Sequence, residues 1–161
     1  MKLSELKAYI YQRDNQLPDV DDGTFQGLLD RAIANVRGAL MEFDSNAFHA
    51  QLSSQTAPVA FPDDLVQDEQ TLFYQEGSDI IVSDDFINER LGVWSFNGTL
   101  DIVYPKNIAR FSSMETVLPF KNRKSEEILI SEMLALINLS YEQNENTAAV
   151  SNSISQSNRV N

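Results

Sequence analysis

The chain contains no cysteine, which excludes disulfides, thiolate metal sites and cysteine nucleophiles. Its six glycines form neither a GxGxxG motif nor a P-loop, so the usual nucleotide-binding loops are excluded as well. The single histidine, His49, lies in a polar stretch that would not hold a catalytic imidazole rigidly, and one histidine cannot build a histidine-rich metal site. We therefore expect no enzymatic activity, no cofactor and no metal, with His49 at the surface.

Long apolar runs are also absent. The longest, residues 128–130, is ended by Ser131 and Glu132, far short of the length that crosses a bilayer. The first six residues lack the basic-then-apolar order of a signal peptide. The sequence therefore predicts a protein that does not enter a membrane, and that is kept in the cytoplasm or incorporated into something built there.

Carboxylates are plentiful, but they sit among Gln, Asn and Ser, where solvated charge is the expected state rather than acid/base chemistry. The run from Asp19 to Thr24 fails the calcium-loop pattern and is better explained as a helix cap. The carboxylates considered in this way are Asp63, Asp64, Asp68, Glu69, Asp84, Asp85 and Glu89.

Basic residues are few, and the formal net charge is -12. A chain of this charge is repelled by phosphate, so a sequence-reading nucleic-acid binder is not expected, and contact with DNA would be non-specific. The basic residues are clustered, however: five lie between residues 102 and 124, against the single carboxylate of Glu115. This pattern fits either a solvated surface or a protein whose two faces meet differently charged neighbours.

Apolar spacing predicts three helices, over residues 3–12, 24–42 and 125–141. The first two form a helical hairpin, and the second has the clearest stripe. Ser125 is the expected cap of the third helix, whose apolar residues cover more than one face and therefore predict a subunit interface as well as a core. The second stripe comprises Phe25, Leu28, Leu29, Ala32, Ile33, Val36 and Leu40.

Between the helices, residues 44–58 are polar and predict a surface loop or flexible arm. Residues 59–104 predict a small antiparallel β region, with short strands at 72–74 and 80–82 and a short helix beginning near Ser83. The strongest local signal is Asn97-Gly98, which predicts a type I′ hairpin between residues 93–96 and 99–104. Trp94 is expected in the core or an interface.

The last segment, residues 142–161, is rich in Asn, Ser and Gln and has too little apolar surface to fold alone. Together with the basic stretch before the third helix, it is either a frayed terminus beside a solvated loop or an arm that docks on a partner. The residues predicted to contact a partner are Lys121, Arg123, Lys124, Leu134, Ile137, Val150 and Ile154.

The order of these segments resembles head-to-tail connector proteins of tailed bacteriophages. The resemblance rests on the opening helix, the acidic gap before Thr24, the Val59-Ala60-Phe61-Pro62-Asp63 entry into the β region, the strand ending at Tyr104, and the closing helix with its polar tail. The segments themselves predict an α+β fold with one domain over residues 1–141 and a flexible C-terminal arm over residues 142–161. The resemblance implies a ring, usually a dodecamer, that sits under the portal, extends the DNA channel and carries neck or tail proteins.

Two alternatives share these features. Another phage neck or tail-completion protein would form a ring with a different neighbour. A small acidic inhibitor, such as an immunity protein that mimics nucleic acid, would also be acidic and lack catalytic residues. A carbohydrate-active or hydrolytic enzyme is a remote third alternative. Native mass, measured with and without portal protein, separates these classes.

Overall fold

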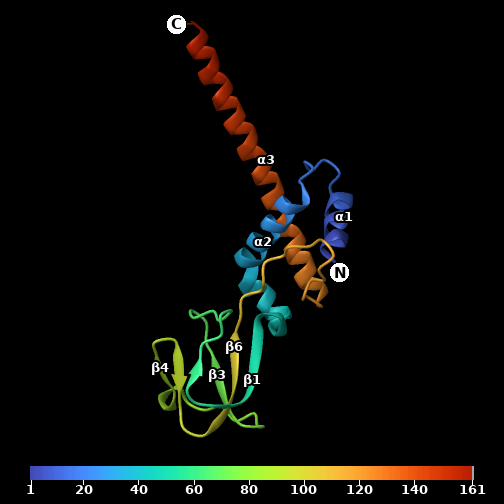
Figure 1. The fold of residues 1–161 in the computed structure, drawn as a ribbon. Coiled ribbons are helices and arrows are strands. Elements are labelled where there is room, and N and C mark those ends of the chain that lie inside the picture. Colours follow the sequence, from blue (N-terminus) through green and yellow to red (C-terminus); the bar gives the residue numbers. More distant parts are fainter. Residues whose placement is uncertain (161) are drawn as a thin grey trace. The chain divides into compact units, whose positions relative to one another are not determined.

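The computed structural model describes residues 1–160, and it describes side chains as far as residue 142. The chain divides into two compact units, which are best followed by sequence colour in Figure 1. Residues 1–43 and the chain from Arg110 onward form the helical unit, and residues 44–109 form the β unit. The predicted α+β class is confirmed, and the β unit is an insertion between the second and third helices.

In the helical unit, α1 (Leu3–Arg13) and α2 (Asp22–Phe43) follow the predicted helices closely. The predicted core positions of α1, Leu3, Leu6 and Ile10, are fully buried. The predicted acidic cap of α2 is also confirmed, since Asp21 Oδ1 accepts a hydrogen bond of 2.7 Å from the backbone N–H of Thr24. The same backbone N–H lowers the pKa of Asp21.

The helices do not pair as simply as the predicted hairpin of α1 and α2. The most extensive helix contacts in this unit are between α2 and α3 (Arg123–Val160), and α1 also contacts α3. Apolar side chains of all three helices form the core, which contains Leu3, Leu6, Ile10, Phe25, Leu29, Ala32, Ile33, Leu40, Leu129, Ile130, Met133, Leu136 and Ile137.

The basic stretch before α3 is tied to the N-terminus. The backbone N–H groups of Leu3 and Ser4 donate to the carbonyls of Thr116 (3.0 Å) and Met114 (2.9 Å). Phe111, Leu118 and Phe120 are buried, so this segment fills the core beside the helices. Its carbonyls also satisfy N–H groups at the start of α1 that have no partner inside the helix.

The start of α3 corrects one prediction. The helix begins at Arg123, and Asn122 Oδ1 accepts a hydrogen bond of 2.9 Å from the backbone N–H of Lys124, so Asn122 is the cap. Ser125 is instead inside the helix, fully buried, and its hydroxyl has no partner in the described structure. The helical backbone continues to Val160, past the predicted boundary at Tyr141. The side chains of the predicted arm lie outside the described residues, and its role stays a prediction.

The β unit contains two three-stranded antiparallel sheets. The larger has the order β1 (His49–Thr56), β6 (Thr99–Pro105), β3 (Leu72–Gln75), and the smaller has the order β2 (Val59–Ala60), β5 (Val93–Ser95), β4 (Asn88–Arg90). The prediction of a polar linker over residues 44–58 is therefore wrong. A short 3-10 helix, Ser45–Phe48, leads into β1, Phe48 is fully buried, and β1 pairs with β6 along most of its length.

The predicted Asn97-Gly98 hairpin is also wrong. Its two arms, β5 and β6, belong to different sheets, and in the described backbone only Gly98 of the two turn residues has a positive φ (+78°). The two-residue hairpin lies instead between β4 and β5, where Leu91 and Gly92 have φ of +54° and +75° and Arg90 pairs with Val93. Two successive positive φ values are the mark of a type I′ turn.

The other predictions for residues 72–86 are confirmed only in part. Residues 72–74 form β3 as predicted, but residues 80–82 return beside it through a single bridge, Tyr74 to Ile81, after the turn at Gly77. Ser83 caps a 3-10 turn, Asp84–Phe86, by accepting from the backbone N–H of Asp85. The predicted short helix goes no further, because β4 begins two residues later.

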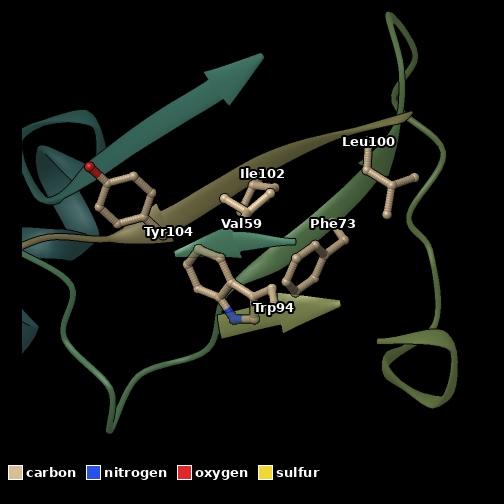
Figure 2. Packing of buried hydrophobic residues seen from close by; sticks show 6 residues of the cluster. All are labelled: Val59, Phe73, Trp94, Leu100, Ile102 and Tyr104. Atoms are coloured by element: carbon tan, nitrogen blue, oxygen red, sulfur yellow. The ribbon is translucent and has the colours of Figure 1, made fainter. Parts of the chain in front are cut away.

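The core of the β unit lies between the two sheets, as Figure 2 shows. Trp94 is at its centre and is 1% exposed, so the prediction of a core position is confirmed. Its ring lies 4.6 Å from that of Phe61 and 5.7 Å from that of Phe73, the latter edge to face, a favourable arrangement for aromatic pairs. The buried members are Val59, Phe73, Trp94, Leu100, Ile102 and Tyr104.

A buried carboxylate holds the larger sheet together. Strand alternation predicts Asp101 on a wet face, but this residue is buried at the middle of β6, the central strand. Its two oxygens accept from the backbone N–H of Ser54 (2.7 Å), in a bulge of β1, and of Gly77 (2.9 Å), in the turn after β3. These two hydrogen bonds lower the pKa of Asp101. One side chain thus links both neighbours of β6.

Candidate functional site

His49 is the first side chain to consider for chemistry, and it begins β1. Its Nδ1 lies 2.8 Å from the carbonyl oxygen and 3.2 Å from the hydroxyl of Ser45, so local backbone holds the ring. Within the residues that the structure describes, no group of three or more His, Asp or Glu side chains is placed to hold a metal ion. The described helices also include none whose length and apolar content suit a membrane span.

The β unit has a cavity of about 310 Å³ with an aromatic floor of Phe61, Phe73 and Trp94. Glu89 on its wall accepts a hydrogen bond of 3.2 Å from Trp94 Nε1. The side chains that line it include carboxylates, amides and one threonine, but no histidine, lysine or serine. Among these carboxylates, Glu89 has a structural partner in the core.

The helical unit has a larger, more open groove of about 550 Å³ between α2 and α3. Val36 and Phe43 of α2 and Ile128 of α3 give it apolar walls, and Lys124, Glu127, Ser131 and Glu132 complete the lining. Val36 has non-helical backbone angles (φ -109°, ψ 16°), so α2 is kinked where the groove passes it. An apolar groove between two helices is a typical docking site for a protein segment.

The polar side chains of this groove have partners within the helical unit. Lys124 Nζ lies 5.2 Å from the centre of the Phe43 ring, within the range of a cation–π contact. Glu132 accepts a hydrogen bond of 2.9 Å from Asn35, and Glu127 pairs with Arg123 at 3.3 Å. The last pair is largely exposed and is therefore weak, so Glu127 remains available to another cation.

The residues that were predicted to contact a partner differ in exposure and in location. Lys121, Arg123 and Lys124 are exposed at the start of α3, and Lys124 lines the groove. Leu134 is half-buried, whereas Ile137 is fully buried in the core of the helical unit and cannot contact another molecule without rearrangement. Val150 and Ile154 lie outside the residues whose side chains are described.

Four large apolar side chains of the β unit are exposed, and sequence patterns alone did not identify them as a surface. Ile80 and Ile81 are 57% and 59% exposed, Phe86 is 74% exposed, and Leu91 at the hairpin tip is 92% exposed. Single exposed apolar residues are ordinary, and these four lie within twelve positions of one small unit. The sequence signal for this surface was the Leu91-Gly92 pair, which predicts a turn between two short strands less strongly than Asn-Gly does.

The described residues thus place an apolar groove on the helical unit and four exposed apolar side chains on the β unit. Ion pairs in the helical unit are at its surface, such as Lys2 with Glu115 at 2.7 Å and Lys7 with Asp22 at 3.0 Å.

Comparisons of the chain with protein-family models, with curated proteins and with solved structures found no match.

Proposed function

We propose that the chain is a non-enzymatic virion protein, the head-to-tail adaptor of a tailed bacteriophage. In this role identical copies form a ring under the portal, extend the DNA channel and provide the attachment platform for neck or tail proteins. The chain is made in the host cytoplasm and then acts at the head–tail junction of the virion.

The observation that carries this proposal is α3. It is one helix of 38 residues, roughly 57 Å long at 1.5 Å per residue. Its last buried residue, among those whose side chains are described, is Ile137, and Leu139 and Tyr141 beyond it are 42% and 47% exposed. Helices in water depend on packing of an apolar face, so the exposed Leu139 and Tyr141 beyond the last described core residue favour a partner that covers this part of α3.

The charge of the chain fits the same role. With a net charge of -12, a ring of these copies would repel DNA phosphate, so a genome would slide through its channel without adhering. The exposed side chain of Leu91 on the β unit adds an apolar contact of the kind that a ring needs between neighbours.

One observation favours a second candidate. The same net charge suits a small acidic inhibitor that mimics nucleic acid against a basic enzyme. Such an inhibitor acts as a monomer or dimer, and it has no need of a helix as long as α3 or of apolar side chains exposed on a separate unit.

The test is native mass spectrometry and electron microscopy of the full chain, alone and mixed with the purified portal ring of the same phage. The proposal expects a complex that contains one portal ring and one ring of this chain. A ring that forms but does not bind portal would assign the chain to another neck or tail position. A chain that stays monomeric or dimeric at every concentration, with portal present, would reject both and leave the inhibitor.

A further inference from the structure

The tip of the β4–β5 hairpin combines two unfavourable features in one residue. Leu91 has a left-handed backbone conformation (φ +54°) and a side chain that is 92% exposed. Steric contact between Cβ and the backbone makes that conformation costly for residues other than glycine, and asparagine tolerates it best among the rest. For the isolated chain, an asparagine in place of Leu91 would suit the turn better and would expose no apolar surface. Residues held in such conformations are concentrated at functional sites.

The residue beside this tip supplies a charge. Arg90 is exposed and pairs through its backbone with Val93, and within the described residues its guanidinium forms no ion pair. The tip therefore presents one large exposed apolar side chain in the turn and one exposed cation at the adjacent end of β4. A matching surface needs an apolar depression with carboxylates at its edge.

The groove of the helical unit has these properties. Val36, Phe43 and Ile128 provide apolar walls, and Glu127 and Glu132 outnumber the single lining cation, Lys124, which is held over Phe43. A volume of about 550 Å³ accommodates a leucine side chain and its flanking turn. We propose that the Leu91 tip of one copy seats in the α2–α3 groove of a second copy, with Arg90 facing Glu127 and Glu132.

This contact would use different surfaces on the two copies. A contact of this kind repeats from copy to copy and closes into a ring when the rotation between neighbours divides a full turn. The inference therefore rests on the proposed ring and names the surfaces that build it. The tip would act as an anchor residue in a desolvated pocket, with the charges fixing its register.

The test compares Leu91→Asn with the parent and with Ile80→Asn, a control that removes an exposed apolar side chain of the β unit outside the β4–β5 hairpin. Melting temperature and native mass are measured for the full chain, alone and on portal rings. Leu91→Asn should melt at or above the parent temperature, yet assemble at least about tenfold more weakly, the equivalent of one anchor residue lost. Ile80→Asn should assemble as the parent does.

Two further experiments, a charge exchange between the two surfaces and the mixing of two defective variants, identify the surface that the Leu91 tip contacts. Arg90→Glu should weaken assembly and Arg90→Glu with Glu127→Lys should restore it. Mixing Leu91→Asn, which keeps a groove, with the groove variant Ile128→Asp, which keeps a tip, should give heterodimers that grow no further. If Leu91→Asn forms rings as well as the parent, or if the two defective variants give no complex, the contact is wrong while the proposed function stands. If the parent forms no ring even with portal, both are wrong.

Discussion

The packing of the β unit gives a sharp stability prediction at Phe73. This side chain is 2% exposed, lies edge to face on Trp94 at 5.7 Å and contacts the Phe96 ring at 6.2 Å. Replacing a buried phenylalanine by alanine removes its transfer free energy and leaves a cavity, at a cost of about 3–5 kcal/mol. Because whole domains are stable by about 5–15 kcal/mol, Phe73→Ala should remove a large share of the stability of the β unit.

Urea unfolding measures this change directly. Trp94 is the only tryptophan, so its fluorescence reports the β unit, while far-UV circular dichroism is dominated by the helices. With a slope of about 2 kcal/mol per molar urea, a loss of about 4 kcal/mol lowers the fluorescence midpoint by about 2 M. The matched control is Phe86→Ala, because Phe86 is 74% exposed and its loss should cost less than about 0.5 kcal/mol. Equal midpoint shifts for the two variants would refute the assignment of Phe73 to the core.

The remaining predictions concern a turn, a buried carboxylate, the third helix and the C-terminal segment. Gly98→Val should cost about 1–3 kcal/mol in thermal or urea unfolding, since Gly98 has φ +78° and nothing lies near an added Cβ, so the loss is backbone strain alone. The lowered pKa of Asp101 adds stability above its unfolded pKa of about 3.9 that is lost as the pH falls through the folded value; Asp101→Asn should therefore lose less stability than the parent on acidification. Leu134→Asp, at a half-buried position, should cost about 1–3 kcal/mol and abolish assembly under conditions where the variant remains folded, and normal assembly would reject the interface. Deleting residues 142–161 should leave the melting temperature nearly unchanged but remove portal binding, and tight binding by the truncated chain would end the docking role of this segment.

The helices could be predicted because their information is local. Leu3, Leu6 and Ile10 recur at helical spacing, and the Asp21 cap precedes the stripe of α2, so neither boundary needs knowledge of the rest of the chain. The first residue of α3 was harder to predict from the local sequence. Asn122 and Ser125 are both ordinary capping residues, and the choice depends on burial of Ser125 against the other helices.

The strands depend on partners that are distant in the sequence, so the predictions made from local sequence patterns were wrong for β1 and for the Asn97-Gly98 turn. β1 is mostly polar, and it becomes a strand because β6, about fifty residues later, pairs with its backbone and Asp101 stabilises its bulge. Asn97-Gly98 has the composition of a hairpin turn, but Trp94 is required in the small sheet and Ile102 in the large one, so the turn joins two sheets. Tertiary packing outweighed turn propensity.

The candidate site could be predicted only in part for the same reason. A local cluster of charge identifies Lys124, and this residue lines the groove. Sequence patterns place Phe43 and Val36 only at a helix end and in an apolar stripe, because a groove exists only where two helices diverge, here at the kink of α2. Leu91 becomes conspicuous only when its φ and exposure are known.

The two units differ in where their apolar side chains lie. The helical unit uses three apolar residues of α1 and five of α3 for its own core, and the α2–α3 groove is a separate apolar surface. The β unit leaves Leu91 exposed at its hairpin tip, and the core between the sheets does not include that residue. An exposed apolar tip on one unit and an apolar groove on the other would be the two halves of the proposed repeating contact, through which a chain that carries both would assemble with copies of itself.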